Sequence, residues 1–181
     1  EPLAKKLSYY GVETVLNIIH FTDVQLKIRN QLKDLPSFTS LITGRTMQTE
    51  AYSTILLRYA MVKCASLLAE YIKAQCLISG ESLGQVASQT IENLKVTDSA
   101  TSLPILRPLI GLDKEEIIET AHYIDTYETS ILPYEDCCVL FSPKHPVLKA
   151  AIEDVAFLYE KLEVNELIRE AFEKREIKKY F

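Results

Sequence analysis

Residues 76–90 read CLISGESLGQVASQT, and this stretch decides the fold class. Its start is apolar and predicts a short strand, which we expect to be buried on both faces. Ser82 and Gln85 have the spacing of a capping box, in which two side chains satisfy backbone donors reciprocally. We therefore expect a helix over about residues 82–93, with Gly80 at a strand-to-helix turn.

Helical and strand-like patterns alternate along the rest of the chain. Asp113 and Glu116 form a second capping box. Apolar periodicity predicts helices at about 3–10, 22–34, 48–74, 113–124, 146–161 and 164–178, and further strands within 12–21 and 103–109. This alternation indicates an α/β domain with a largely parallel sheet, which binds ligands beyond the carboxyl ends of its strands.

Length and composition allow one sizeable core with a small addition. The chain has 181 residues, of which 48% are hydrophobic and 25% are charged. We divide it into a partial domain over residues 1–145 and a C-terminal helical extension over residues 146–181. Glu1 and Pro2 lead directly into a helical pattern, so we expect the chain to be part of a longer protein.

Several classes of protein do not fit this composition. No run of about eighteen apolar residues occurs, and the start EPLAKKLSYY lacks the order of a signal peptide, so we expect a cytoplasmic protein without a membrane segment. The net charge of -5 argues against strong binding of nucleic acid by this chain alone. The spacing of the cysteines and histidines suits no metal site, and we expect reduced thiols.

Three residues are candidates for a nucleotide site. Gly80 permits a close approach of ligand to backbone, Arg58 carries a planar fork that suits a phosphate or carboxylate, and Gln89 has an amide that can read a base or ribose edge. Each has a plainer interpretation. Parallel α/β proteins need small residues at such turns, Arg58 suits an ion-paired helix position, and Gln89 suits a solvated one.

Cys137 and Cys138 are the candidates for thiol chemistry. They follow Pro133-Tyr134-Glu135-Asp136, a loop-like context that can expose a thiol to a substrate. Neighbouring carboxylates raise the pKa of a thiol, so nothing local marks an activated thiolate. An inert pair and a strained vicinal disulfide remain alternatives.

Taken together, these segments resemble the tRNA 4-thiouridine synthetase family, also called the ThiI family of thiamine biosynthesis proteins. The resemblance covers about residues 20–150. Its most specific pieces are GESLGQVASQT at 80–90, LRPLIGLDKEEII at 106–118 and PYEDCC at 133–138.

The resemblance implies a pyrophosphatase-type (PP-loop) α/β fold of the adenine-nucleotide alpha-hydrolase kind. Such an enzyme binds ATP, with Mg²⁺ as its counter-ion, adenylates a tRNA uridine and replaces the oxygen with persulfide sulfur. Arg58, Gly80 and Gln89 match family positions at the nucleotide. Cys137 matches the cysteine that handles sulfur, with Cys138 as the alternative. The implied partners are tRNA, a cysteine desulfurase or other persulfide donor, and a second copy in a homodimer.

Departures from the family pattern leave two hypotheses. The phosphate-gripping loop Ser-Gly-Gly-x-Asp-Ser is absent from these residues, and residues 36–54 lack the usual basic, methionine-rich pattern. The first hypothesis is a tRNA sulfurtransferase that makes 4-thiouridine, with a link to thiamine thiazole sulfur transfer, and that is inactive as this isolated chain. The second is a non-catalytic relative that serves as a nucleotide-binding or dimerisation module.

Overall fold

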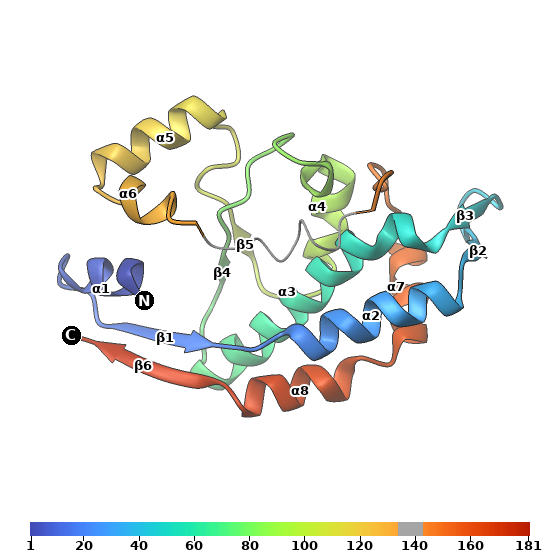
Figure 1. Ribbon diagram of the computed structural model, residues 1–181, viewed down its shortest axis with the longest axis horizontal. Coiled ribbons are helices and arrows are strands. Elements are labelled where there is room, and N and C mark those ends of the chain that lie inside the picture. The colour runs from blue at the N-terminus through green and yellow to red at the C-terminus, as the bar shows by residue number, and fades with distance from the viewer. Residues whose placement is uncertain (134–142) are drawn as a thin grey trace.

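The computed structural model describes residues 1–133 and 143–181 (Figure 1). Helices and strands alternate along most of the chain. Their order is α1 Pro2–Ser8, β1 Thr14–Ile18, α2 Thr22–Asp34, β2 Ser37–Thr39, β3 Thr46–Gln48, the 3-10 turn η1 Thr49–Tyr52, α3 Ser53–Ile72, β4 Leu77–Ile78, the 3-10 turn η2 Ala87–Gln89, α4 Ile91–Asp98, β5 Ile105–Leu106, α5 Lys114–Tyr123, α6 Tyr127–Ser130, α7 Ile152–Leu162, α8 Asn165–Glu173 and β6 Glu176–Tyr180.

Helix α3 runs through the middle of the molecule, and α2, α4, α7 and α8 pack around it (Figure 1). Apolar residues recur along α3 on most of its circumference, so it is buried on several sides. Ile55, Leu56 and Ala60 from this helix are almost completely buried. They share one core with Val24 and Ile28 of α2.

The C-terminal residues contribute to this same core. Val155 and Leu158 of α7 and Ile168 of α8 belong to the main hydrophobic cluster. Asp154, in the first turn of α7, is buried and accepts hydrogen bonds from the Ser40 hydroxyl and the Leu41 amide, each at 2.7 Å. These bonds tie α7 to the hairpin of β2 and β3. The division into residues 1–145 and 146–181 stays a prediction.

The strands form three separate pairs in the described part of the chain. β4 and β5 are parallel, with Leu77 opposite Ile105 and Ile78 opposite Leu106. The pairs β1–β6 and β2–β3 are antiparallel. The expectation that the strand at residues 76–78 is buried on both faces was wrong, because Ile78 is 72% exposed.

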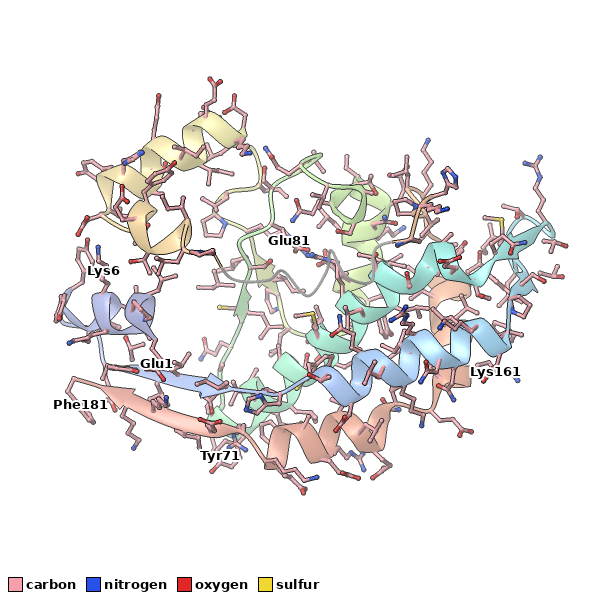
Figure 2. All side chains as sticks on the ribbon, viewed as in Figure 1. Glu1, Lys6, Tyr71, Glu81, Lys161 and Phe181 are labelled. Carbon is pink, nitrogen blue, oxygen red and sulfur yellow. The ribbon has the colours of Figure 1, made fainter. Side chains whose placement is uncertain are left out.

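The last strand, β6, corrects the prediction of a helix over residues 164–178. Helix α8 ends at Glu173, and residues 176–180 then pair with β1, with Thr14 opposite Tyr180. Figure 2 shows Glu1 and Phe181 at the same end of this ribbon. Arg175 fixes the change of direction, because its guanidinium lies over the ring of Phe172 and donates to Asn17 Oδ1 at 3.1 Å.

Helices α5 and α6 form a separate lobe (Figure 1). Neither contains a buried residue. The predicted capping box at the start of α5 is confirmed, since Asp113 and Glu116 each accept the other's backbone amide, at 3.0 and 2.8 Å. Within residues 1–133 and 143–181, none of the helices has the length and apolar character that crossing a bilayer requires.

Candidate functional site

The parallel pair ends in a cluster of polar residues. Backbone pairing between the two strands continues one step beyond them, since Ser79 donates its amide to the Leu106 carbonyl at 2.9 Å. The next residues after this point are Gly80 and Glu81 on one side and Arg107 on the other. Because both strands point the same way, these residues meet at the carboxyl edge, where parallel α/β proteins bind ligands.

The segment after β4 is a loop, and the predicted helix over residues 82–93 was wrong. The Ser82 hydroxyl donates to the Leu112 carbonyl at 2.6 Å and is therefore not a helix cap. Gly84 has a φ of +78°, a left-handed conformation that suits glycine and interrupts a helix. Helix α4 begins at Ile91, where the Thr90 hydroxyl accepts the Asn93 amide at 3.2 Å.

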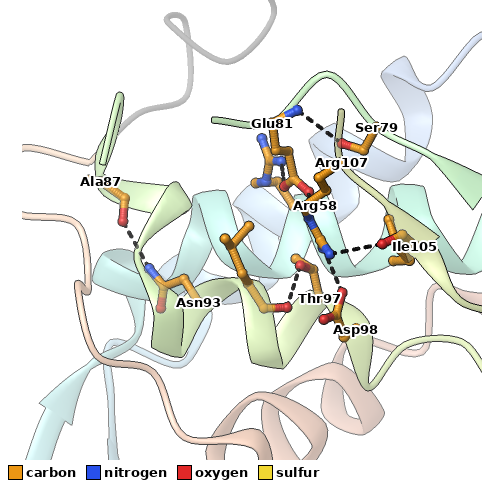
Figure 3. A network of polar contacts seen from close by, with 10 residues as sticks. Arg58, Ser79, Glu81, Ala87, Asn93, Thr97, Asp98, Ile105 and Arg107 are labelled. Atoms are coloured by element: carbon orange, nitrogen blue, oxygen red, sulfur yellow. Dashed lines mark hydrogen bonds and ion pairs between the residues drawn. The ribbon is translucent and has the colours of Figure 1, made fainter. Parts of the chain in front are cut away.

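Glu81 is the centre of an ion network that joins four segments (Figure 3). Arg58 of α3 donates from Nη2 to Glu81 Oε1. Arg107 donates from Nε to Glu81 Oε2 at 2.7 Å and from Nη2 to Asp98 Oδ1 at 2.6 Å. The side chains of Glu81 and Arg107 are only 7% and 10% exposed, so these pairs are largely removed from water.

The network shifts the pKa values of Glu81 and Arg107. Burial alone would raise the pKa of Glu81, but the hydrogen bond from Arg107 and the charges of both arginines outweigh it, so this pKa lies below its usual value. Burial would likewise lower the pKa of Arg107, yet the bonds to Asp98 and Glu81 raise it. Glu81 and Arg107 are therefore both charged at neutral pH.

A second polar centre is Asn93, which lies on α4 as Asp98 does. This side chain is fully buried, and its Nδ2 donates to the carbonyls of Ala87 and Val147 at 2.9 and 2.8 Å. Its Oδ1 accepts the Ala150 amide at 3.1 Å. Asn93 thus holds the turn η2 and the segment that leads into α7 on either side of α4.

Two hollows lie near these elements. One, of about 350 Å³, opens between the loop after β4 and the start of α5. Its lining is Leu83, Gly84, Gln85, Ile110, Gly111, Leu112 and Asp113. A hollow of about 390 Å³ lies between α2 and α3, and none of Arg58, Gly80 and Gln89 lines it. The charged edge and the first hollow are adjacent through Ser82 and Leu83, which bond to Leu112 and Ile110.

Two of the three predicted nucleotide residues, Arg58 and Gly80, lie at this edge. Arg58 contacts Glu81, the neighbour of Gly80 in the chain. Gly80 is exposed, and a Cβ built on it would meet no atom within 4 Å. Gln89 closes η2, where its carbonyl accepts the Gly84 amide at 2.9 Å. Arg58 is therefore both ion-paired and next to the open backbone of Gly80.

Cys137 and Cys138 lie outside the described residues. In the described part, Cys64 and Cys76 are free thiols, and burial raises the pKa of Cys64. The same part contains no group of three or more histidine, cysteine or acidic side chains that would hold a metal ion.

Glu81, Arg107 and Asn93 are the site residues that sequence reasoning missed. A signal existed for the first two. Glu81 directly follows Gly80, and Arg107 is the one charge in the apolar segment LPILRPLIG at 103–111. A charge inside an apolar segment needs a buried partner. No comparable signal marks Asn93.

One family model matches most of this chain. The family model described as "Thiamine biosynthesis protein (ThiI)" matches residues 1–164. The chain belongs to the ThiI family. The match covers all the residues of the charged edge, and it confirms the family resemblance of the three quoted motifs.

Individual relatives of this ThiI chain carry functional names. A probable tRNA sulfurtransferase of Treponema pallidum (strain Nichols) is 47% identical over 175 residues, which are 97% of this chain and 40% of the relative. A protein of the same name from Thermoanaerobacter sp. (strain X514) is 47% identical over 166 residues, 92% of this chain and 40% of the relative. The chain thus spans about 40% of the length of these relatives.

A solved structure shares the fold. It is described as a crystal structure of a 4-thiouridine synthetase–RNA complex with bound ATP, and it superimposes with a TM-score of 0.82 at 34% identity. The match covers 99% of this chain and 43% of that chain. The ThiI chain therefore has the fold of part of a PP-loop ATPase, as predicted.

Proposed function

We propose that this chain supplies the nucleotide-facing part of an ATP-dependent tRNA sulfurtransferase that makes 4-thiouridine. The observation that carries the proposal is the contact between Arg58 and Glu81 beside Gly80, at the carboxyl edge of β4 and β5. Two candidate residues separated in the sequence, Arg58 and Gly80, come together there. The names of the relatives and the bound ATP in the matching structure support the same activity.

The described residues can contact part of an ATP molecule, but they do not provide a site for most of its triphosphate. Open space at Gly80 admits a ligand close to the backbone, and Arg58 keeps a buried Nε without a partner among the described residues. The ion network itself is balanced, with two cations and two anions. Since the loop Ser-Gly-Gly-x-Asp-Ser does not occur in the 181 residues, we propose that other parts of the protein grip most of the triphosphate.

In this scheme ATP activates the substrate and a cysteine delivers the sulfur. Adenylation of the uridine carbonyl oxygen turns a poor leaving group into a good one. Cys137, or Cys138 in its place, then carries or resolves the persulfide. The sulfur comes from a cysteine desulfurase or another persulfide donor, and the same route serves the thiazole of thiamine.

Further parts of the scheme rest on the family alone. We propose that Mg²⁺ arrives with the ATP phosphates, that the working form is a cytoplasmic homodimer, and that tRNA binds mainly through modules outside this chain. The net charge of -5 supports the last point, because phosphate neutralisation needs clustered lysine and arginine.

The test uses the complete protein with ATP, a persulfide donor and unmodified tRNA. Nucleoside analysis of the tRNA is expected to show 4-thiouridine, and calorimetry is expected to show ATP binding that Arg58→Met weakens. A protein that binds ATP but never forms 4-thiouridine would match the alternative, a non-catalytic binding module. Absence of ATP binding would refute the proposal.

A further inference from the structure

The carboxylate of Glu81 is shared by two arginines. Arg58 and Arg107 approach different oxygens of the same group, Oε1 and Oε2. If Arg58 were the sole cation of this network, Glu81 and Asp98 would leave a net negative charge, which repels a phosphate. Arg107 supplies the second positive charge, which balances the network.

Hydrogen bonds to two further groups fix the Arg107 side chain. Its Nη2 donates to Asp98 at the end of α4, and its Nη1 donates to the Ile105 carbonyl at 3.4 Å. Its side chain is less exposed than that of Arg58, 10% against 21%. Arg107 thus faces the protein on every described side, whereas Arg58 retains the unpartnered Nε.

We propose that Arg107 is a positioning residue for nucleotide binding. By sharing Glu81, it lets this carboxylate orient Arg58 while the positive charge of Arg58 stays available to a nucleotide phosphate. The inference rests on the proposed function, in which Arg58 lies at the nucleotide. It adds a residue that acts through another and does not touch the ligand.

The experiment compares ATP with adenosine in the complete protein, using calorimetry. Arg107→Met leaves Glu81 with Arg58 alone, so ATP affinity is expected to fall about tenfold. Adenosine carries no phosphate charge, so its affinity is expected to stay within about twofold. Arg169→Met is the matched control, because Arg169 is an exposed arginine of α8 paired with Glu166, and it is expected to change neither affinity.

Rescue distinguishes a charge effect from damaged packing. The double variant Glu81→Gln/Arg107→Met removes one positive and one negative charge, so Arg58 and Asp98 balance each other, and ATP affinity is expected to return to within about threefold of the wild type. Arg107→Lys keeps the charge but loses the fork that bonds both Glu81 and Asp98, so its loss of ATP affinity is expected to be clearly smaller than that of Arg107→Met. This second single variant keeps the test decisive if Arg107→Met does not fold.

The outcomes separate the two proposals. A wild-type protein that does not bind ATP overturns the proposed function and this inference together. A wild-type protein that binds ATP, with Arg107→Met binding it equally well, overturns the positioning role alone. The same holds if the double variant stays as weak as the single one, or if Arg107→Lys loses as much affinity as Arg107→Met.

Discussion

Asn93 binds Val147 through its side-chain amide, with Nδ2 donating to the Val147 carbonyl at 2.8 Å. The same nitrogen donates to Ala87, in the turn that contains Gln89. Val147 follows Cys138 by nine residues in the chain. One buried side chain therefore fixes both the turn that contains Gln89 and the start of the segment that follows the candidate sulfur-handling cysteines.

Asn93→Ala should destabilise the chain strongly. The change leaves the Ala87 and Val147 carbonyls and the Ala150 amide without their partner in a buried place. The free energy of unfolding is expected to fall by about 3 kcal/mol. Urea denaturation measures it.

Asn30→Ala is the control for this change, because Asn30 is an exposed residue of α2. It is expected to shift the free energy of unfolding by less than about 0.5 kcal/mol. Equal effects of the two changes would contradict the role assigned to Asn93.

Glu81→Gln should alter the response of stability to acid. The pKa of Glu81 lies below its ordinary value of 4.5, so its ion pairs contribute fully to stability above that pH. The contribution is lost as the pH falls from 4.5 through the folded-state pKa. The difference in the free energy of unfolding between the wild type and Glu81→Gln is therefore expected to become smaller as the pH falls below 4.5.

Denaturation curves recorded from neutral to acidic pH test this prediction. Glu166→Gln is a suitable control, since the side chain of Glu166 is 79% exposed. The difference in the free energy of unfolding between this variant and the wild type is expected to stay nearly constant over the same pH range. A Glu81→Gln gap that does not change with pH would mean that the carboxylate contributes nothing as a charge.

Gly80→Val should separate ligand binding from folding. The added side chain meets no protein atom at its Cβ, so stability is expected to change by less than about 0.5 kcal/mol. We expect ATP affinity of the complete protein to fall, because the branched side chain enters the space proposed for the nucleotide. Calorimetry with ATP decides the point.

Gly84→Val offers the opposite pattern. Its φ of +78° makes any side chain strained, so a loss of about 1–2 kcal/mol in stability is expected. If Gly80→Val bound ATP like the wild type, the nucleotide would not lie against this turn.

Cys137→Ser should abolish thiolation in the complete protein and leave ATP binding intact, because a hydroxyl cannot carry persulfide sulfur. Nucleoside analysis of tRNA and calorimetry are the two measurements. Cys138→Ser is the matched comparison and is expected to retain activity. Normal 4-thiouridine from Cys137→Ser, with loss in Cys138→Ser, would move the role to Cys138.

Local signals predicted the fold well where they act within a few residues. The capping box of Asp113 and Glu116 forms as its spacing predicts, because both partners lie in the same turn. Ser82 and Gln85 have the same spacing and do not form one. The Ser82 hydroxyl bonds instead to Leu112, thirty residues away in sequence, and such a distant partner leaves no mark on local spacing.

Other features depended on distant contacts in the same way. The segment EIKKY at 176–180 contains charged residues that are common in helices. It is nevertheless a strand, because it pairs with β1. Arg58, Gly80 and Gln89 were placed at the nucleotide by the family pattern, and this role stays a prediction. The network around Glu81 required the folded structure, since its members come from four separate segments.

The ribbon of β1 and β6 also governs the order in which the molecule assembles. Thr14 faces Tyr180, so the two strands meet only when almost the entire described chain has been gathered. Closing so long a loop costs much entropy, and pairs of this kind form late. Until then both edges of β1 are unpaired and open to wrong partners. Correct folding therefore depends on the helices around α3 forming early enough to bring the two strands together.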